Sequence, residues 1–270
     1  MLTTDDSMRT QRVLSFMAHP DDAEIFCAGT LALLQEKGFE IHIATMTPGD
    51  CGSTQHSAGE IARIRLAEAR RAAAKIRAQY YCAGQRDLLI TYEAGTIRAA
   101  VEIVREARPA LVITHAPQDY LPDHEFTSLV VRNACFAASA PNFDTGRRPA
   151  QQPTERIPHL YYAAPAAGID ILGRAVASSL YIDISAVMDL KIEMLACHES
   201  QREWLRAQHG MDEYLEEARR WSAELGERAG YPYAEGFRQH LGHPYPGNDR
   251  LAEVLGGVCR PSDPAAPASR

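Results

Sequence analysis

The chain has 270 residues, of which 46% are hydrophobic and 23% charged, and its formal net charge is -7. These values fit a globular protein with a sizeable core, and the length allows one large domain or two small ones. The negative charge argues against nucleic acid or an anionic membrane as partner. No apolar run approaches the roughly 18 residues that a membrane span needs, and no signal peptide is apparent. The six cysteines form no C-x-x-C pair, so we expect reduced thiols and a cytoplasmic protein.

Apolar runs and helix-forming segments alternate along the first half of the chain. The predicted strands lie at residues 12–17, 40–46, 79–82 and 110–115. The predicted helices lie at residues 23–37, 58–77, 96–108 and 125–139. Residues 88–92 fit neither pattern clearly. Strand and helix in strict alternation predict a mostly parallel, Rossmann-like α/β sheet with helices on both faces.

The second half begins with a change in composition. Residues 141–158 contain four prolines and several arginines, which predicts a surface loop. Beyond it we predict strands at 159–163 and 179–184, helices at 186–208 and 211–225, and a turn-rich apolar segment at 230–237. We expect residues 1–250 to form one domain with C-terminal helices. Residues 251–270, which end in a Pro/Ala/Ser-rich stretch, are expected to be a partly disordered tail.

A dense group of acids and one imidazole follows the first predicted strand. His19, Asp21, Asp22 and Glu24 all lie within six residues, at the turn into the first helix. In open α/β sheets, ligands bind just beyond the carboxyl ends of the strands, where this turn would lie. The simplest alternative is an acidic helix N-cap, which is a common feature.

A second turn favours a ligand site over a simple helix N-cap. Residues 118–124 follow the buried strand at 110–115 and end in His124. If the two strands are neighbours, His19, Asp22 and His124 meet at one edge of the sheet. Two histidines and a carboxylate with open positions suit a catalytic Zn²⁺ and, by donor type, also a non-haem Fe²⁺.

Asp21 is the residue that favours hydrolysis. Consecutive carboxylates point in different directions, so that Asp22 can bind the metal while Asp21 faces a water molecule that the metal activates. Asp21 could accept a proton from this water and pass it to a leaving amine. An Fe²⁺ oxygenase needs no such base, which favours Zn²⁺. Glu24 is expected to favour the helix N-terminus or to orient a ligand.

These residues resemble the PIG-L/LmbE superfamily of N-acetylglucosaminyl deacetylases. The resemblance rests on residues 18–24 and on Pro122-Asp123-His124, and more loosely on Arg65-x-x-Glu68 and residues 233–237. It implies a Rossmann-like fold with a C-terminal helical extension. It also implies that His19, Asp22 and His124 are zinc ligands, that Asp21 is the general base, and that Arg65 helps to hold a sugar. The resemblance is compatible with a homo-oligomer.

The second motif departs from the family pattern, which is His-Pro-Asp-His. Leu121 stands where the family has its first histidine, a donor to the oxyanion or leaving group. Losing one such donor costs on the order of 10²–10³ in rate, so we expect a substitute. The candidates are Asp119, Tyr120, His115 and His198.

Three of the residues considered beyond the metal ligands, His115, His198 and Arg65, also have a purely structural alternative. Asp119, Tyr120 and His198 are grouped with Arg65 as expected substrate-binding residues. His115 could instead make a structural hydrogen bond, and His198 could pack within its helix. Arg65 could form an ion pair with Glu68, one helical turn away.

The sequence thus predicts a Zn²⁺-dependent hydrolase that removes acetyl from a small N-acetylglucosamine-type substrate. Three alternatives stay open. The first is an amidase acting on another N-acyl compound or a thiol conjugate. The second is a metal- or sugar-binding homologue with impaired catalysis, a reading that Leu121 motivates. The third is a non-haem Fe²⁺ oxygenase, against which the fold argues by analogy alone.

Overall fold

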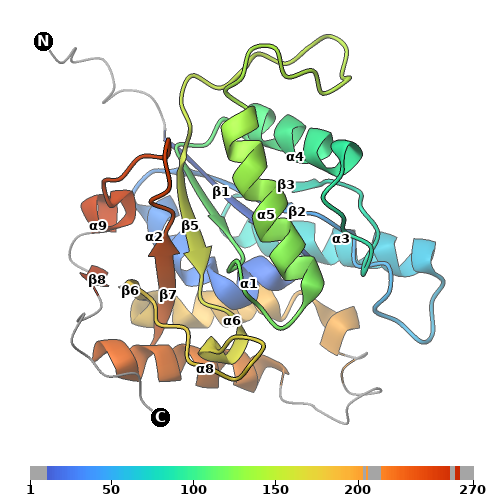
Figure 1. Cartoon of the computed structure of the whole chain (residues 1–270). Coiled ribbons are helices and arrows are strands. Elements are labelled where there is room, and N and C mark those ends of the chain that lie inside the picture. The colour runs from blue at the N-terminus through green and yellow to red at the C-terminus, as the bar shows by residue number, and fades with distance from the viewer. Residues whose placement is uncertain (1–10, 203–204, 206–213, 256–258, 262–270) are drawn as a thin grey trace, which may run out of the picture.

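The computed structural model describes residues 11–202, 205, 214–255 and 259–261. Its strands form one sheet in the order β3-β2-β1-β4-β5-β7-β6-β8 (Figure 1). The strands are β1 (Arg12–Met17), β2 (Glu40–Thr45), β3 (Gln79–Cys82), β4 (Leu111–Thr114), β5 (His159–Ala163), β6 (Leu180–Asp183), β7 (Ala234–Gln239) and β8 (Cys259–Pro261). Strands β1 to β5 are mutually parallel, whereas β7 runs antiparallel to β5 and β6, and β8 antiparallel to β6. The predicted Rossmann-like, mostly parallel sheet is confirmed.

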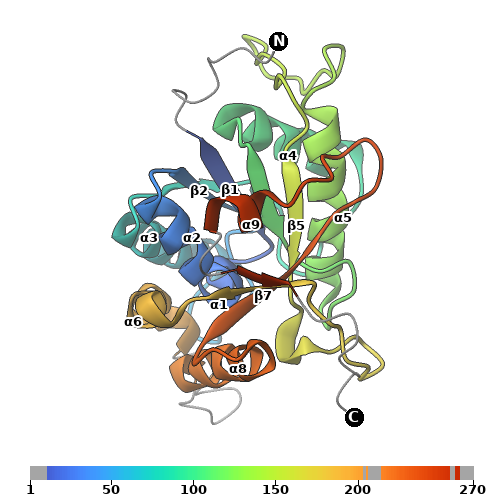
Figure 2. The ribbon, with the colours of Figure 1, turned by 90° about the vertical axis from the view of Figure 1, so that its left-hand side faces the viewer.

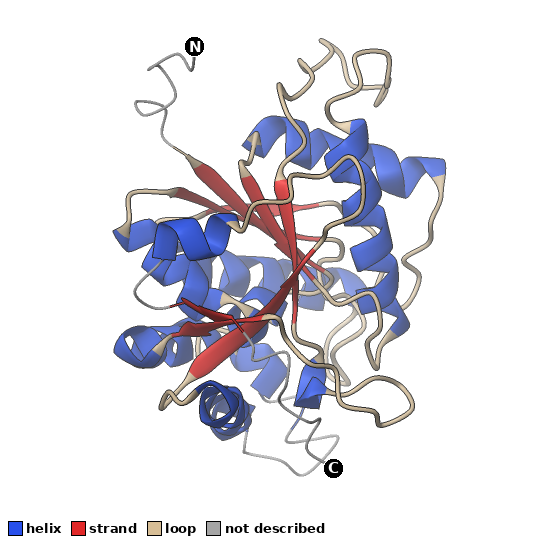
Figure 3. Ribbon diagram, turned by 60° about the vertical axis from the view of Figure 1, so that its left-hand side comes forward, coloured by secondary structure: helices blue, strands red, loops and turns tan. Residues whose placement is uncertain are grey.

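Helices cover both faces of the sheet (Figures 2 and 3). They are α1 (Asp22–Phe26), α2 (Ala28–Glu36), α3 (Ala58–Lys75), α4 (Ala94–Ala107), α5 (Pro122–Ala137), α6 (Met188–Leu195), α8 (Tyr214–Ala229) and α9 (Arg250–Leu255). Two short 3-10 turns lie at Ala166–Gly168 and Ser185–Val187. No helix in the described ranges is long and apolar enough to cross a bilayer.

Each face of the sheet packs into its own hydrophobic cluster. Side chains alternate across β1, so that Leu14 and Phe16 pack with α4 and α5, while Val13 and Met17 pack with α1, α2 and α6. Burial on both faces explains why β1, β2 and β4 read as nearly continuous apolar runs.

The predicted first helix, 23–37, is wrong in one respect, because it breaks at Cys27. That residue adopts φ -151 and separates α1 from α2. The break frees the N–H groups of Gly29 and Thr30, which donate to the two carboxylate oxygens of Glu235 at 2.9 and 2.8 Å. A carboxylate 205 residues further along the chain therefore caps the new helix start, and the local sequence carries no sign of it.

The second half departs further from its predicted elements. The predicted helix 186–208 ends at Leu195, and residues 196–198 form a turn before helix resumes at residue 199. The segment 230–237, predicted as turn-rich, contains the first part of β7. Of the predicted tail, 251–270, the described residues lie in α9 and β8, and residues 256–258 and 262–270 lie outside the described residues. The C-terminal extension therefore adds strands as well as helices.

Candidate active site

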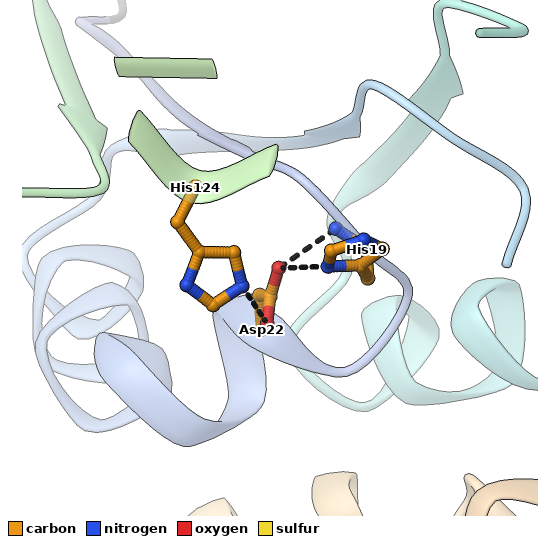
Figure 4. Close-up of side chains that lie close together, drawn as sticks. All are labelled: His19, Asp22 and His124. Carbon is orange, nitrogen blue, oxygen red and sulfur yellow. Dashed lines mark hydrogen bonds and ion pairs between the residues drawn. The ribbon is translucent and has the colours of Figure 1, made fainter. Parts of the chain in front are cut away.

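Two turns at the carboxyl edge of the parallel strands meet in the structure (Figure 4). The turn after β1 carries His19, Asp21 and Asp22, and the turn after β4 leads to His124. They meet because β1 and β4 are hydrogen-bonded neighbours. His124 was expected on a loop but lies in the first turn of α5, which begins at Pro122. Proline suits that position because the first helical N–H needs no partner within the helix.

One atom from each of His19, Asp22 and His124 lies within 4.8 Å of the others, and all three side chains are buried or nearly so. Asp22 Oδ2 accepts the backbone N–H of His19 at 2.7 Å and lies 3.3 Å from His19 Nδ1. Asp22 Oδ1 lies 3.6 Å from His124 Nε2. The sequence-predicted ligand trio is therefore brought together, with a donor set typical of catalytic zinc.

A second carboxylate stands behind each of the two histidines. Asp119 Oδ1 lies 3.1 Å from His124 Nδ1, and Asp123 Oδ2 lies 3.2 Å from His19 Nε2. The Asp123 oxygen also accepts the backbone N–H of Leu88 at 2.7 Å. Carboxylates in such positions orient metal-binding histidines and fix their tautomers. Asp119, expected to bind substrate, is buried and contacts His124 through Oδ1, while its Oδ2 has no hydrogen-bond partner among the described residues.

The electrostatics of the trio favour a cation. Burial lowers the pKa of His19, but hydrogen bonds with Asp123 and Asp22 raise it by more, to about 10. Burial likewise opposes ionisation of Asp22, yet His124 and His115 hold its pKa well below the usual range. A site that stabilises a proton on His19 this strongly has a negative potential, which also favours a bound metal ion. The residues present therefore fit Zn²⁺.

His115 supports the site from behind. Its ring stacks on that of His124, with centroids 3.8 Å apart and an interplanar angle of 10°. The backbone N–H of Ala18 donates to His115 Nε2 at 3.0 Å, and the same nitrogen lies 3.1 Å from Asp22 Oδ2. Burial and the neighbouring His124 lower the pKa of His115 to about 4, so the ring is neutral at pH 7. This is the structural hydrogen bond that was one of its two expected roles.

Asp21 lies in a strained turn beside the trio. Its φ of 103 is in the left-handed region, which non-glycine residues rarely adopt. Its Oδ1 lies 3.4 Å from Arg65 Nη2, which also donates to the carbonyl of Pro20 at 2.8 Å. Burial raises the pKa of Asp21, and Arg65 opposes that rise.

Arg65 therefore pairs with Asp21 and not with Glu68, so the Arg65–Glu68 alternative is wrong. Glu68 instead accepts the backbone N–H and the hydroxyl of Ser200, at 3.0 and 2.6 Å. Arg65 is buried, and its guanidinium packs against Gly49 and Gly52, where a Cβ would approach it to within 2.6 and 2.9 Å. Those two glycines leave the space that the arginine fills.

Sequence reasoning missed Tyr214. Its hydroxyl donates to Asp21 Oδ2 at 2.6 Å, from the first turn of α8. The two residues are 193 positions apart, and no local pattern around Tyr214 distinguishes it from an ordinary core aromatic residue.

The two remaining predicted residues differ in their exposure. His198 is buried, with Nε2 3.5 Å from Glu24 Oε2. Tyr120 is 64% exposed, and the edge of its ring approaches His124 with centroids 5.4 Å apart. Of the four predicted substrate-binding residues, Tyr120 alone is exposed to solvent.

A cavity of about 930 Å³ lies at the opposite edge of the sheet, at the beginnings of β1, β2 and β5. Its lining includes Arg12, Arg108 and His159. None of the candidate site residues lines this cavity. The candidate site lies instead at the carboxyl ends of the parallel strands.

Comparison with known proteins agrees with this geometry. Residues 14–135 match the family model PIG-L, described as GlcNAc-PI de-N-acetylase. This stretch of the chain is thus similar to the PIG-L family. The match includes His19, Asp21, Asp22 and His124, and it ends within α5, before Tyr214.

Relatives resemble more of the chain than this stretch. Diacetylchitobiose deacetylase of Thermococcus kodakarensis is 28% identical over 246 residues, which cover 84% of this chain and 82% of that protein. The solved N,N'-diacetylchitobiose deacetylase of Pyrococcus horikoshii matches with TM-score 0.73 and 25% identity, over 87% of each chain. GalB, the 4-carboxy-2-hydroxymuconate hydratase of Pseudomonas putida KT2440, has TM-score 0.70 over 88% of this chain and 100% of its own. At 19% identity, GalB shares the fold alone.

Proposed function

We propose that this protein is a zinc-dependent hydrolase that removes the N-acetyl group from a small amino-sugar substrate. The observation that carries the proposal is the meeting of His19, Asp22 and His124 beside Asp21. The similarity to diacetylchitobiose deacetylases supports the substrate class.

His19, Asp22 and His124 would hold the metal, and Asp119 and Asp123 would keep the two imidazoles in place. A bound Zn²⁺ would act as a Lewis acid toward the acetyl carbonyl and would acidify a water molecule. In the hydrolysis, the water oxygen bonds to the carbonyl carbon and the C–N bond breaks. Asp21 would accept the proton that the water loses and return it to the nitrogen of the leaving amine.

Of the four residues predicted to bind substrate, one is exposed to solvent and three are buried. Tyr120 is exposed next to His124 and would contact the substrate. It precedes Leu121, which replaces the histidine of the family. Arg65, Asp119 and His198 are buried, and their contacts are with Asp21, His124 and Glu24 respectively. We infer that these three act on the substrate only through those neighbours.

The test is acetate release from a panel of N-acyl compounds by protein loaded with Zn²⁺. The panel contains N-acetylglucosamine, an alkyl glycoside of it, diacetylchitobiose and an N-acetylated cysteine conjugate. Release from the sugars, lost after chelation and restored by Zn²⁺, is the expected result. Release from the cysteine conjugate alone would favour the amidase alternative. Zinc binding without any acetate over hours would point to a catalytically impaired homologue.

Asp21→Asn distinguishes catalysis from metal binding. We expect this variant to keep its zinc, because the ligand trio is intact, and to lose turnover by about 10²-fold or more, because the proton acceptor is gone. Zinc content by elemental analysis and acetate release are measured on the same sample. Full activity in Asp21→Asn would exclude this residue as the base.

A further inference from the structure

Tyr214 is held in place by packing that does not involve its hydroxyl. Its ring belongs to a buried cluster with Leu195 of α6 and Ala218 of α8, against which Ile25 and Ile192 also pack. The aromatic ring is therefore fixed between α1, α6 and α8. The hydroxyl lies at the end of this fixed ring, 2.6 Å from Asp21 Oδ2.

Each oxygen of the Asp21 carboxylate contacts a side chain from a different, distant part of the sequence. Arg65 of α3 reaches Oδ1 at 3.4 Å, and Tyr214 of α8 reaches Oδ2 at 2.6 Å. All three side chains are buried. Hydrogen bonds to an ionised, buried acceptor are shorter and stronger than neutral ones, and their geometry restricts the carboxylate to one orientation.

Asp21 needs such restraint more than an ordinary aspartate does. A non-glycine residue with φ of 103 is strained, and it persists only where its surroundings hold it. No side chain caps α1 from this position, since Asp21 makes no capping hydrogen bond. Its carboxylate instead contacts Arg65 and Tyr214.

We propose that Tyr214 is a positioning residue for Asp21, so that the C-terminal helix α8 completes a site whose other parts lie in the stretch that is similar to the PIG-L family. This inference rests on the proposed function, because it gives Asp21 the role of proton acceptor. Tyr214 itself neither binds the metal nor exchanges protons with the substrate.

Tyr214→Phe is the decisive variant, because it removes one oxygen and keeps the packed ring. Tyr161→Phe is the matched control. Tyr161 is also a buried tyrosine that donates to an aspartate, Asp249, at 2.8 Å, but it lies outside the site. Thermal unfolding confirms that both variants are folded before kinetics are compared.

We expect Tyr214→Phe to lower kcat by about 10- to 100-fold, the range found when a partner of an active-site group is removed. KM and the zinc content should remain those of the wild type, because neither the substrate contact nor the ligand trio changes. Tyr161→Phe should keep the wild-type kcat. In an Asp21→Asn background, Tyr214→Phe should cause no further loss, because its effect acts through the carboxylate.

Other results of these experiments would contradict the proposal. Wild-type kcat in Tyr214→Phe overturns this inference alone, and so does a full additional loss in the Asp21→Asn background. Zinc lost in proportion to activity would show that Tyr214 supports the metal site instead. A wild-type protein that binds zinc but releases no acetate from the panel overturns the proposed function, and this inference with it.

Discussion

At the scale of single residues, the candidate site is built from carboxylates that restrain imidazoles. Asp119 holds His124 and Asp123 holds His19, each at hydrogen-bond distance. Asp123 and Asp22 also raise the pKa of His19 to about 10, although burial opposes this. Asp123 thus both orients an imidazole and makes its surroundings more negative.

Asp119→Asn should weaken zinc binding by about 10- to 100-fold, since an amide orients His124 less well than a carboxylate does. Zinc affinity is measured by competition with a chelator of known affinity. Asp144→Asn is a suitable comparison, because Asp144 lies on the exposed loop and pairs with Arg148. Equal zinc affinities in the two variants would contradict the role given to Asp119.

The raised pKa of His19 predicts a pH-dependent stability of the metal-free protein. The group ionises near 6.5 when unfolded and near 10 when folded, so the folded state binds the proton more tightly. Its contribution is complete below about pH 6.5 and is lost as the pH rises toward about 10. Urea unfolding in the presence of a chelator should show the wild type losing its advantage over His19→Gln across this range. A constant difference between the two proteins would contradict the prediction.

At the scale of elements, a buried ion pair joins the broken first helix to the C-terminal strands. Lys191 of α6 donates to Glu235 of β7 at 2.7 Å, and to the carbonyl of Ile25 at 2.7 Å. Glu235 in turn caps α2 at Gly29 and Thr30. These contacts fasten α1, α2, α6 and β7 to one another directly behind the turn that carries the site.

Glu235→Ala should destabilise the fold by about 3–5 kcal/mol, because Lys191 is then left as an unpaired buried charge. The control is Glu193→Ala, which removes a similar pair with Lys75 at 3.1 Å. Glu193 is 62% exposed and Lys75 is 35% exposed, and we expect a loss of less than about 1 kcal/mol there. Chemical unfolding gives both values. Similar losses for the two variants would show that burial does not matter at Lys191.

At the scale of the whole molecule, one sheet unites segments that are distant in sequence. Five parallel strands supply the edge at which the candidate metal ligands meet, and β7, paired antiparallel with β5 and with β6, extends the sheet on the β5 side. The helix α8 packs on β7 and β6 and brings Tyr214 to Asp21. The candidate ligands thus come from the first half of the chain, and Tyr214, which supports Asp21, comes from the second half.

A metal that joins the β1 turn to α5 should stabilise the entire fold. With free Zn²⁺ at about 100 times its Kd, the free energy of unfolding should rise by about 2.7 kcal/mol. His124→Ala should abolish most of this gain, because it removes one of the three ligands. Thermal or chemical unfolding with and without Zn²⁺ measures it. An equal gain in His124→Ala would place the zinc elsewhere.

The sequence by itself determined the alternation of strands and helices in the first half and the two turns that carry the candidate ligands. Apolar periodicity is a local property, and it predicted β1, β2, β4 and most of α3 to α5 to within a few residues. The meeting of His19, Asp22 and His124 was predicted on the condition that the two strands before them are neighbours, and the structure shows that β1 and β4 are.

Only the tertiary structure decided what surrounds those residues. Glu235 caps the helix that starts after Cys27, Asp21 is the partner of Arg65, and the hydroxyl of Tyr214 donates to Asp21. Each of these contacts joins segments that are about 45 to 205 residues apart. Such contacts are selected by packing and by the need to satisfy buried polar groups, neither of which leaves a periodic signal in the chain.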